Sequence, residues 1–150
     1  MKLSEHFSLE ELIATQHRGI DNRPTDLALA NLKLLAEVLE EVRLLLGTPM
    51  IISSGYRCPD LNELVGGARN SRHMLGLAAD FISTDYGTPL KICQAIRDSR
   101  IMFDQLIQEF PDRYDGGWVH FGIAPDDTQP RVQVMHITMA DEKYALGLKE

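Results

Sequence analysis

The chain has 150 residues, of which 44% are hydrophobic and 25% are charged, and this balance is typical of a soluble globular protein. The length suits one domain with a single core, so we predict one domain over residues 1–150. The formal net charge of −7 and the scattered Lys and Arg residues argue against binding to nucleic acid or to an anionic membrane surface.

The N-terminal segment, Met1–His6, lacks the basic and apolar parts of a secretory signal, and no apolar run reaches the length of a membrane span. We therefore expect the protein to be made and folded in the cytoplasm, without membrane insertion. The two cysteines, Cys58 and Cys93, are too few for a disulfide scaffold and form no CxxC pair. We interpret both as ordinary thiols.

Two helices are predicted in the first third of the chain. Ser8 followed by Glu11 matches a capping box, and a short helix to about Ala14 is expected. After a break at residues 22–25, a long helix that ends at Gly47 is predicted by apolar residues at helical spacing: Leu29, Leu32, Leu35, Ala36, Leu39, Val42 and Leu46. We expect this helix to be core scaffold.

The middle of the chain combines short apolar runs with a long loop. Buried strands are predicted at residues 50–53 and 78–83. Between them, residues 54–72 form a Gly-rich loop with one expected helical turn at residues 59–65, and a loop of this length in a compact domain is usually functional. Thr88–Pro89 then opens another helix, because Thr is a good N-cap and Pro suits the first helical position.

Three strand-like segments complete the chain, at residues 103–110, 118–123 and 131–138, with turn-rich stretches between them. We therefore expect a run of hairpins, followed by a final helical turn in the polar tail from Asp141. This order of elements predicts an α+β fold, with a mostly antiparallel sheet and helices packed on one face. Three residues of the chain predict a metal site at this sheet.

The metal prediction depends on two histidines and one aspartate. His73 and Asp80 lie seven positions apart on one passage from loop to strand, where Gly76 allows a sharp turn, and His120 lies in a later apolar run. Two imidazoles and a carboxylate are the ligands of a catalytic Zn²⁺, which keeps its fourth position open for a water of lowered pKa. The alternative is a metal-free core cluster in which the three side chains only bond to one another.

These residues belong to a longer pattern that resembles the D-alanyl-D-alanine carboxypeptidase family of zinc peptidases, which includes vancomycin-resistance D,D-dipeptidases and phage endolysins. The resemblance covers nearly the whole chain, and residues 5–12 and 103–109 look like its small phage and prophage branch. It is carried by Ser54-Gly55-Tyr56-Arg57, by Ser71-x-His73-x-x-Gly76-x-Ala78-x-Asp80 and by Trp118-x-His120.

The resemblance implies that His73, Asp80 and His120 hold Zn²⁺, and that Arg57 and Ser71 bind the substrate. The planar guanidinium of Arg57 can grip a carboxylate with two hydrogen bonds, although a salt bridge to a nearby Asp60 or Glu63 is the alternative. Ser71 is equally suited to capping a loop. Trp118 either walls the site or is a plain core residue, whereas His6, His17 and His136 have no ligand-like surroundings.

The general base is the point where this sequence departs from the family pattern. Many members carry an acid three residues before the last histidine, and here that residue is Gly117. Two other carboxylates are candidates, Glu109 at the end of a strand and Asp115 in the following turn. We prefer Glu109, because an ionisable residue at the end of an apolar strand needs a polar partner.

The resulting hypothesis is a zinc metallopeptidase that hydrolyses a peptide bond in bacterial cell-wall (peptidoglycan) peptides, as a D,D-carboxypeptidase or an endolysin-type endopeptidase. An endolysin would wait in the cytoplasm until a separate pore releases it to the wall, and a cytoplasmic dipeptidase fits almost as well. The alternative from another class is a catalytically inactive zinc-binding structural domain, such as a phage particle component, and Gly117 favours it. The sequence carries no signal for an oligomeric state.

Overall fold

The helices begin where the sequence supplies caps. In the computed structural model, which describes residues 1–150, the hydroxyls of Ser8 and Thr25 each accept a hydrogen bond from the first turn of a helix. The helices are α1 (Leu9–Ile13), α2 (Asp26–Leu46), α3 (Pro59–Leu64), the 3₁₀ helix η1 (Arg72–Leu75) and α4 (Pro89–Arg97). The long helix ends at Gly47 in the left-handed conformation, as its sequence predicts.

Six strands form one sheet in the spatial order β1-β2-β4-β3-β5-β6. All neighbouring strands run antiparallel except β3 and β5, which are parallel. The strands are β1 (Ile51–Ser54), β2 (Ala78–Ile82), β3 (Gln105–Glu109), β4 (Trp118–Gly122), β5 (Gln133–Ile137) and β6 (Ala145–Leu146). The predicted α+β class with a mostly antiparallel sheet is confirmed.

The predicted run of hairpins is correct for β3 and β4 but wrong for β5. Instead of folding back on β4, β5 pairs with the other edge of β3, so the chain crosses over one strand. An ion pair between half-exposed Arg131 and buried Asp104 holds this crossover: the guanidinium of Arg131 contacts the carboxylate of Asp104 at 2.6 Å, and the Arg131 backbone N–H donates to the same carboxylate. Asp104 immediately precedes β3, so the pair sets the position of β5 beside β3.

The C-terminal segment is also different from the prediction. The expected helical turn after Asp141 is a tight turn followed by β6, which pairs antiparallel with β5. Lys149, beyond β6, is held by the buried side chain of Gln108 in β3. The Gln108 side chain donates to the backbone carbonyl of Lys149 and accepts from its N–H. These two bonds satisfy the backbone N–H and carbonyl of Lys149 without a helix.

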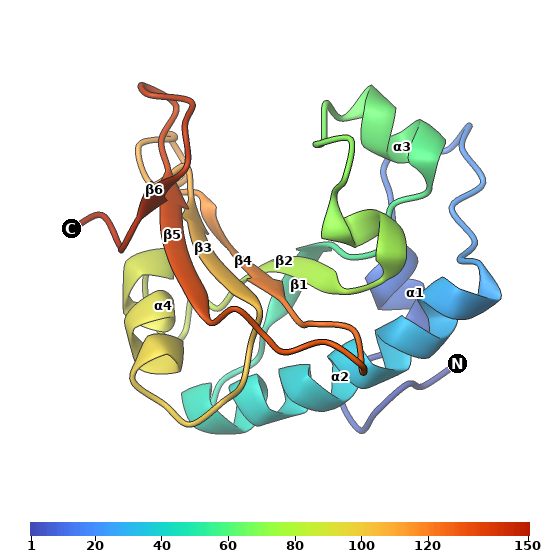
Figure 1. The fold of residues 1–150 in the computed structure, drawn as a ribbon, viewed down its shortest axis with the longest axis horizontal. Coiled ribbons are helices and arrows are strands. Elements are labelled where there is room, and N and C mark those ends of the chain that lie inside the picture. The colour runs from blue at the N-terminus through green and yellow to red at the C-terminus, as the bar shows by residue number, and fades with distance from the viewer.

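The two faces of the central strands are chemically distinct. Alternate residues of a strand point to opposite faces. One face carries apolar side chains that join the core with α2 and α4, namely Ala79, Phe81, Leu106, Val119 and Phe121. Figure 1 shows α2 and α4 on the same side of the sheet, with α3 on the other side of the molecule from β6. The opposite face carries Asp80, Glu109 and His120.

None of the helices combines the length and the apolar composition of a membrane-spanning segment. Both cysteines are free thiols, in agreement with the prediction. The thiol of Cys93 is buried in the core, and this burial raises its pKa to about 12. Cys93 is therefore a packing residue at neutral pH.

Candidate metal centre

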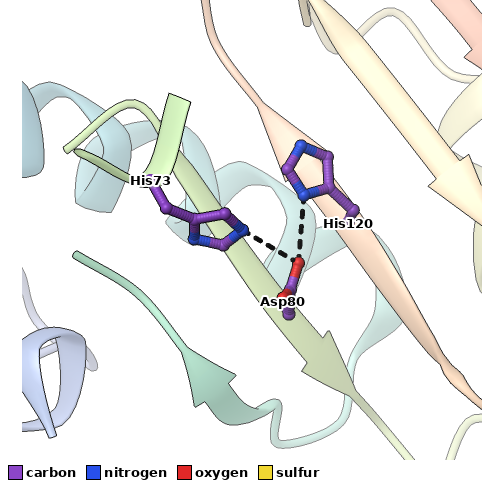
Figure 2. Close-up of side chains that lie close together, drawn as sticks. All are labelled: His73, Asp80 and His120. Atoms are coloured by element: carbon purple, nitrogen blue, oxygen red, sulfur yellow. Dashed lines mark hydrogen bonds and ion pairs between the residues drawn. The ribbon is translucent and has the colours of Figure 1, made fainter. Parts of the chain in front are cut away.

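His73, Asp80 and His120 meet on the face of the sheet opposite to α2 and α4. Figure 2 shows the Asp80 carboxylate between the two imidazoles, with His73 from η1 on one side and His120 from β4 on the other. The Asp80 Oδ1 atom is 3.3 Å from His73 Nε2 and 3.0 Å from His120 Nδ1. One ligand atom from each residue lies within 4.8 Å of the others, and all three residues are buried.

The fold brings these residues together in two steps. Asp80 and His120 are direct partners in the β2–β4 ladder, so their side chains project side by side from one face. His73 reaches them because η1 ends at Gly76, which adopts a positive φ of 73° and turns the chain into β2. A Cβ atom at this position would lie 2.5 Å from the backbone oxygen of Ala28 in α2, so only glycine fits.

A backbone hydrogen bond on the side away from Asp80 fixes the orientation of the His73 ring. Its Nδ1–H donates a hydrogen bond of 2.7 Å to the backbone carbonyl of Gly55. Nε2 is therefore the atom with a free lone pair, and it is buried without a hydrogen-bond partner. A backbone carbonyl behind the ligand is the usual way in which proteins set the tautomer of a metal-binding histidine.

The donor set and its spacing fit Zn²⁺. Two ligand atoms about 2.1 Å from a tetrahedral ion lie about 3.4 Å apart, close to the separations of both histidine nitrogens from Asp80 Oδ1. The electrostatics also favour a cation. Burial alone would raise the pKa of Asp80, but the adjacent His73 and His120 hold it well below the usual range, so the carboxylate is charged and ready to bind.

Glu109 lies next to this cluster. Its Oε1 atom is 3.4 Å from His120 Nδ1, and its side chain is largely buried. Burial raises the pKa of Glu109 to about 7, and the negative charge of Asp80 acts in the same direction. The positive charges of His120 and Arg57 act against this rise. A carboxyl group with a pKa near neutrality, within reach of a metal centre, can both accept and return a proton.

Gly117 explains why no acid stands three residues before the last histidine. Its backbone has a positive φ of 73°, and an added Cβ atom would lie 2.0 Å from the Glu109 backbone oxygen and 2.5 Å from that of Phe110. Asp115, the second candidate base, is committed to the turn: its carboxylate accepts a hydrogen bond from the Gly117 N–H and pairs with Arg113 at 3.2 Å. The geometry therefore favours Glu109.

Arg57 and Ser71, the predicted substrate-binding residues, lie on the segment before the cluster. Arg57 forms no ion pair with Asp60 or Glu63, and its Nη1 makes a long hydrogen bond of 3.3 Å to Asn62. Its Nε is buried without a partner, which leaves donor capacity for a ligand. The Ser71 hydroxyl accepts a hydrogen bond from the His73 N–H, so it caps η1 and supports a proposed metal ligand.

Two further residues complete the surroundings. Trp118 is the β4 partner of Glu109, so its indole stands beside that carboxylate, and its Nε1–H is buried without a partner. The sequence did not indicate a role for Asn22, which lies in the break predicted between the first two helices. Its buried amide donates to the carbonyl of Tyr56 and accepts from the N–H of Cys58, so it fixes the backbone on both sides of Arg57.

Comparison with protein families gives one match. A family model described as Peptidase M15 matches residues 5–115, which is most of the chain. The matched region includes Arg57, Ser71, His73, Asp80 and Glu109, whereas the second histidine of the cluster follows its end. No curated protein matches the chain.

Proposed function

The chain belongs to the peptidase M15 family, whose members are zinc-dependent peptidases, and from this premise we propose that it hydrolyses a peptide bond in bacterial cell-wall peptides. The observation that carries the proposal is the placement of Glu109 beside the cluster of His73, Asp80 and His120 on one face of the sheet. The resemblance to D-alanyl-D-alanine carboxypeptidases and phage endolysins supports the cell-wall substrate.

In the proposed reaction, His73, Asp80 and His120 hold the metal ion. When bound, Zn²⁺ polarises the scissile carbonyl and makes water a stronger nucleophile. Glu109 accepts the proton of the attacking water and returns it to the nitrogen of the leaving amine, so its carboxylate is unchanged at the end of the cycle. The pKa of Glu109, raised by burial, suits both transfers near neutral pH.

Arg57 and Trp118 supply the substrate contacts in this proposal. The unpartnered Nε of Arg57 and the rest of its guanidinium are suited to a peptide carboxylate, the group that a carboxypeptidase must recognise. Trp118 gives the site an apolar wall next to Glu109, and its indole N–H lies near that carboxylate, whose pKa it lowers. Ser71 acts indirectly by capping η1.

The inactive zinc-binding domain is not favoured. Its main support was the missing acid at Gly117, and that position is closed by the backbone of Glu109 and Phe110. Glu109 supplies a carboxylate from the neighbouring strand instead. An inactive domain would have no need for a buried carboxyl group beside its metal ligands, because burial of such a group costs free energy.

The test uses the purified, zinc-loaded protein and defined muropeptides, with mass spectrometry of the released fragments. We expect a new amine terminus, and the fragment masses identify the bond as D-Ala–D-Ala or L-Ala–D-Glu. Glu109→Gln should lower kcat by about 10²- to 10⁴-fold while zinc content stays equimolar. The matched control is Asp115→Asn, which changes the other candidate carboxylate of the same hairpin and should leave kcat close to wild type.

Three results would contradict parts of the proposal. Zinc binding without release of any amine would favour a structural domain. Purified protein without zinc at near-equimolar level would favour the metal-free core cluster. A large loss of kcat in Asp115→Asn, with Glu109→Gln close to wild type, would move the general base to Asp115.

A further inference from the structure

Tyr144 lies in the same row of the sheet as Glu109. Glu109 of β3 is paired with Ile137 of β5, and the β5–β6 ladder pairs His136 with Ala145. Continuing this antiparallel register by one residue places Tyr144 beside Ile137. Because residues opposite each other in a sheet project to the same face, Tyr144 stands on the face that carries Glu109.

The Tyr144 hydroxyl responds to the charges of the site. The residue is 55% exposed, and its hydroxyl makes no hydrogen bond within the protein. Burial raises the pKa of this hydroxyl, the negative charges of Glu109 and Asp80 raise it further, and the positive charge of Arg57 opposes them. These three charged residues come from three separate segments, and the hydroxyl lies within electrostatic range of all three.

The segment that carries Tyr144 is anchored on both sides. Before it, the Asp112 carboxylate accepts hydrogen bonds of 2.8 and 3.1 Å from the backbone N–H groups of residues 139–140. After it, the side chain of Gln108 forms two hydrogen bonds with the backbone of Lys149. Gln108 is the neighbour of Glu109, and Asp112 lies three residues beyond it. The tyrosine is therefore held in place relative to the strand that supplies the proposed base.

We propose that Tyr144 is a further substrate-binding residue, whose hydroxyl donates a hydrogen bond to an oxygen of the bound peptide. This inference rests on the proposed function and deepens it. Trp118 and Tyr144 stand on opposite sides of Glu109, one on β4 and the other beyond β5. In this register Trp118 is the direct neighbour of Glu109 on one side, and Ile137 lies between Glu109 and Tyr144 on the other. A neutral phenol suits this place, because the negative charges of Glu109 and Asp80 keep the hydroxyl protonated and a peptide rich in oxygen atoms needs donors.

The test separates binding from turnover. In the zinc-loaded Glu109→Gln background, binding of the stem peptide L-Ala–γ-D-Glu–L-Lys–D-Ala–D-Ala is measured by calorimetry. Adding Tyr144→Phe, which removes only the hydroxyl, should weaken binding by about three- to tenfold, the value of one hydrogen bond. In the otherwise wild-type protein, the same change should lower kcat/KM on muropeptides by a similar factor. Zinc content and melting temperature should stay at the wild-type level.

The matched control is Tyr114→Phe, because Tyr114 is 92% exposed in the turn between β3 and β4. This variant should bind and cleave like wild type. If wild type cleaves muropeptides and Tyr144→Phe binds and cleaves equally well, the tyrosine inference is wrong and the proposed function stands. If wild type neither binds nor cleaves these peptides, both are wrong.

Discussion

The two faces of β2, β4 and β3 are built from the same strands but follow different rules. The helix-covered face places Phe81, Phe121 and Leu106 in a fully buried core with α2 and α4. The opposite face buries Asp80 and His120 and largely buries Glu109. The neighbouring histidines lower the pKa of Asp80, and the negative charge of Asp80 helps to raise the pKa of Glu109. Both carboxylates lie within ion-pair distance of His120. Because successive side chains of a strand point to opposite faces, a residue that stabilises the core is followed directly by a residue of the candidate site. Substitutions on the two faces should therefore have separable effects.

The largest expected effect is on the charged face. Asp80→Asn keeps the shape of the side chain but removes the anionic ligand between the two histidines. Zinc content should fall well below equimolar, and kcat/KM should fall on the order of a thousandfold, because the metal supplies several kcal/mol of transition-state stabilisation. Elemental analysis and peptide-cleavage assays measure both quantities.

The fold should survive this substitution. Its far-ultraviolet circular dichroism should match that of the wild type, because none of the core contacts with α2 and α4 changes. A variant that keeps equimolar zinc and full turnover would show that the carboxylate is not a ligand. A variant that unfolds would show that the charged face contributes to folding, and the separation of the two faces would be lost.

The next effect is on the apolar face. Phe121 is fully buried and is flanked along β4 by His120, so Phe121→Ala probes the core one residue away from the metal cluster. The free energy of unfolding should fall by about 3–5 kcal/mol, from lost burial and the cavity that remains. Denaturant titration measures this loss. Activity per folded, zinc-loaded molecule should stay within about twofold of wild type, and a loss as large as that of Asp80→Asn would break the comparison.

The smallest effect is a pH dependence of the free energy of unfolding, caused by Glu109 on the charged face. In zinc-free protein, burial raises the pKa of Glu109 from 4.5 to about 7. Between these values the folded protein holds a proton that the unfolded chain releases, so stability present at low pH is lost as the pH rises through this window. Above this window the buried charge of Glu109 lowers the free energy of unfolding, on the order of 1 to 3 kcal/mol, and Glu109→Gln should remove this pH-dependent loss.

Denaturant titrations of zinc-free wild type and Glu109→Gln at pH 5, 6, 7 and 8 give this difference. The free energy of unfolding of wild type should fall relative to the variant up to about pH 7, where the pKa of Glu109 lies, and then level off. Parallel curves would mean that the carboxyl group is as well solvated in the folded state as in the unfolded chain. In that case its burial beside His120 would have no energetic consequence.

The sequence predicted the parts of the fold that depend on local signals. The long helix α2 follows from apolar spacing, with Thr25 and Gly47 at its two ends. The pairing of β5 with β3 could not be predicted in this way, because the choice between two sheet edges depends on contacts between distant residues. Here Arg131 reaches back to Asp104, and nothing in the local pattern of either residue indicates this partner.

The residues of the site also fall into those that local sequence patterns predict and those that depend on the fold. His73, Asp80 and His120 could be grouped from residue type and spacing, and the structure brings them within ligand distance of one another. Asn22 and Tyr144 carry no motif, since each acts through a hydrogen bond or a sheet register that forms only in the folded chain. Their roles depend on which segment the fold places beside them.

The close approach of Gly117 to the backbone of Glu109 and Phe110 limits how this site can be redesigned. No side chain fits at residue 117, so a proton-transfer group cannot be grafted there to match the more common arrangement of the family. Changes in acid–base chemistry have to be introduced on β3, at Glu109 itself. A sequence pattern that requires an acid three residues before the last histidine would therefore sort this chain with inactive relatives, although it has a buried carboxylate 3.4 Å from that histidine.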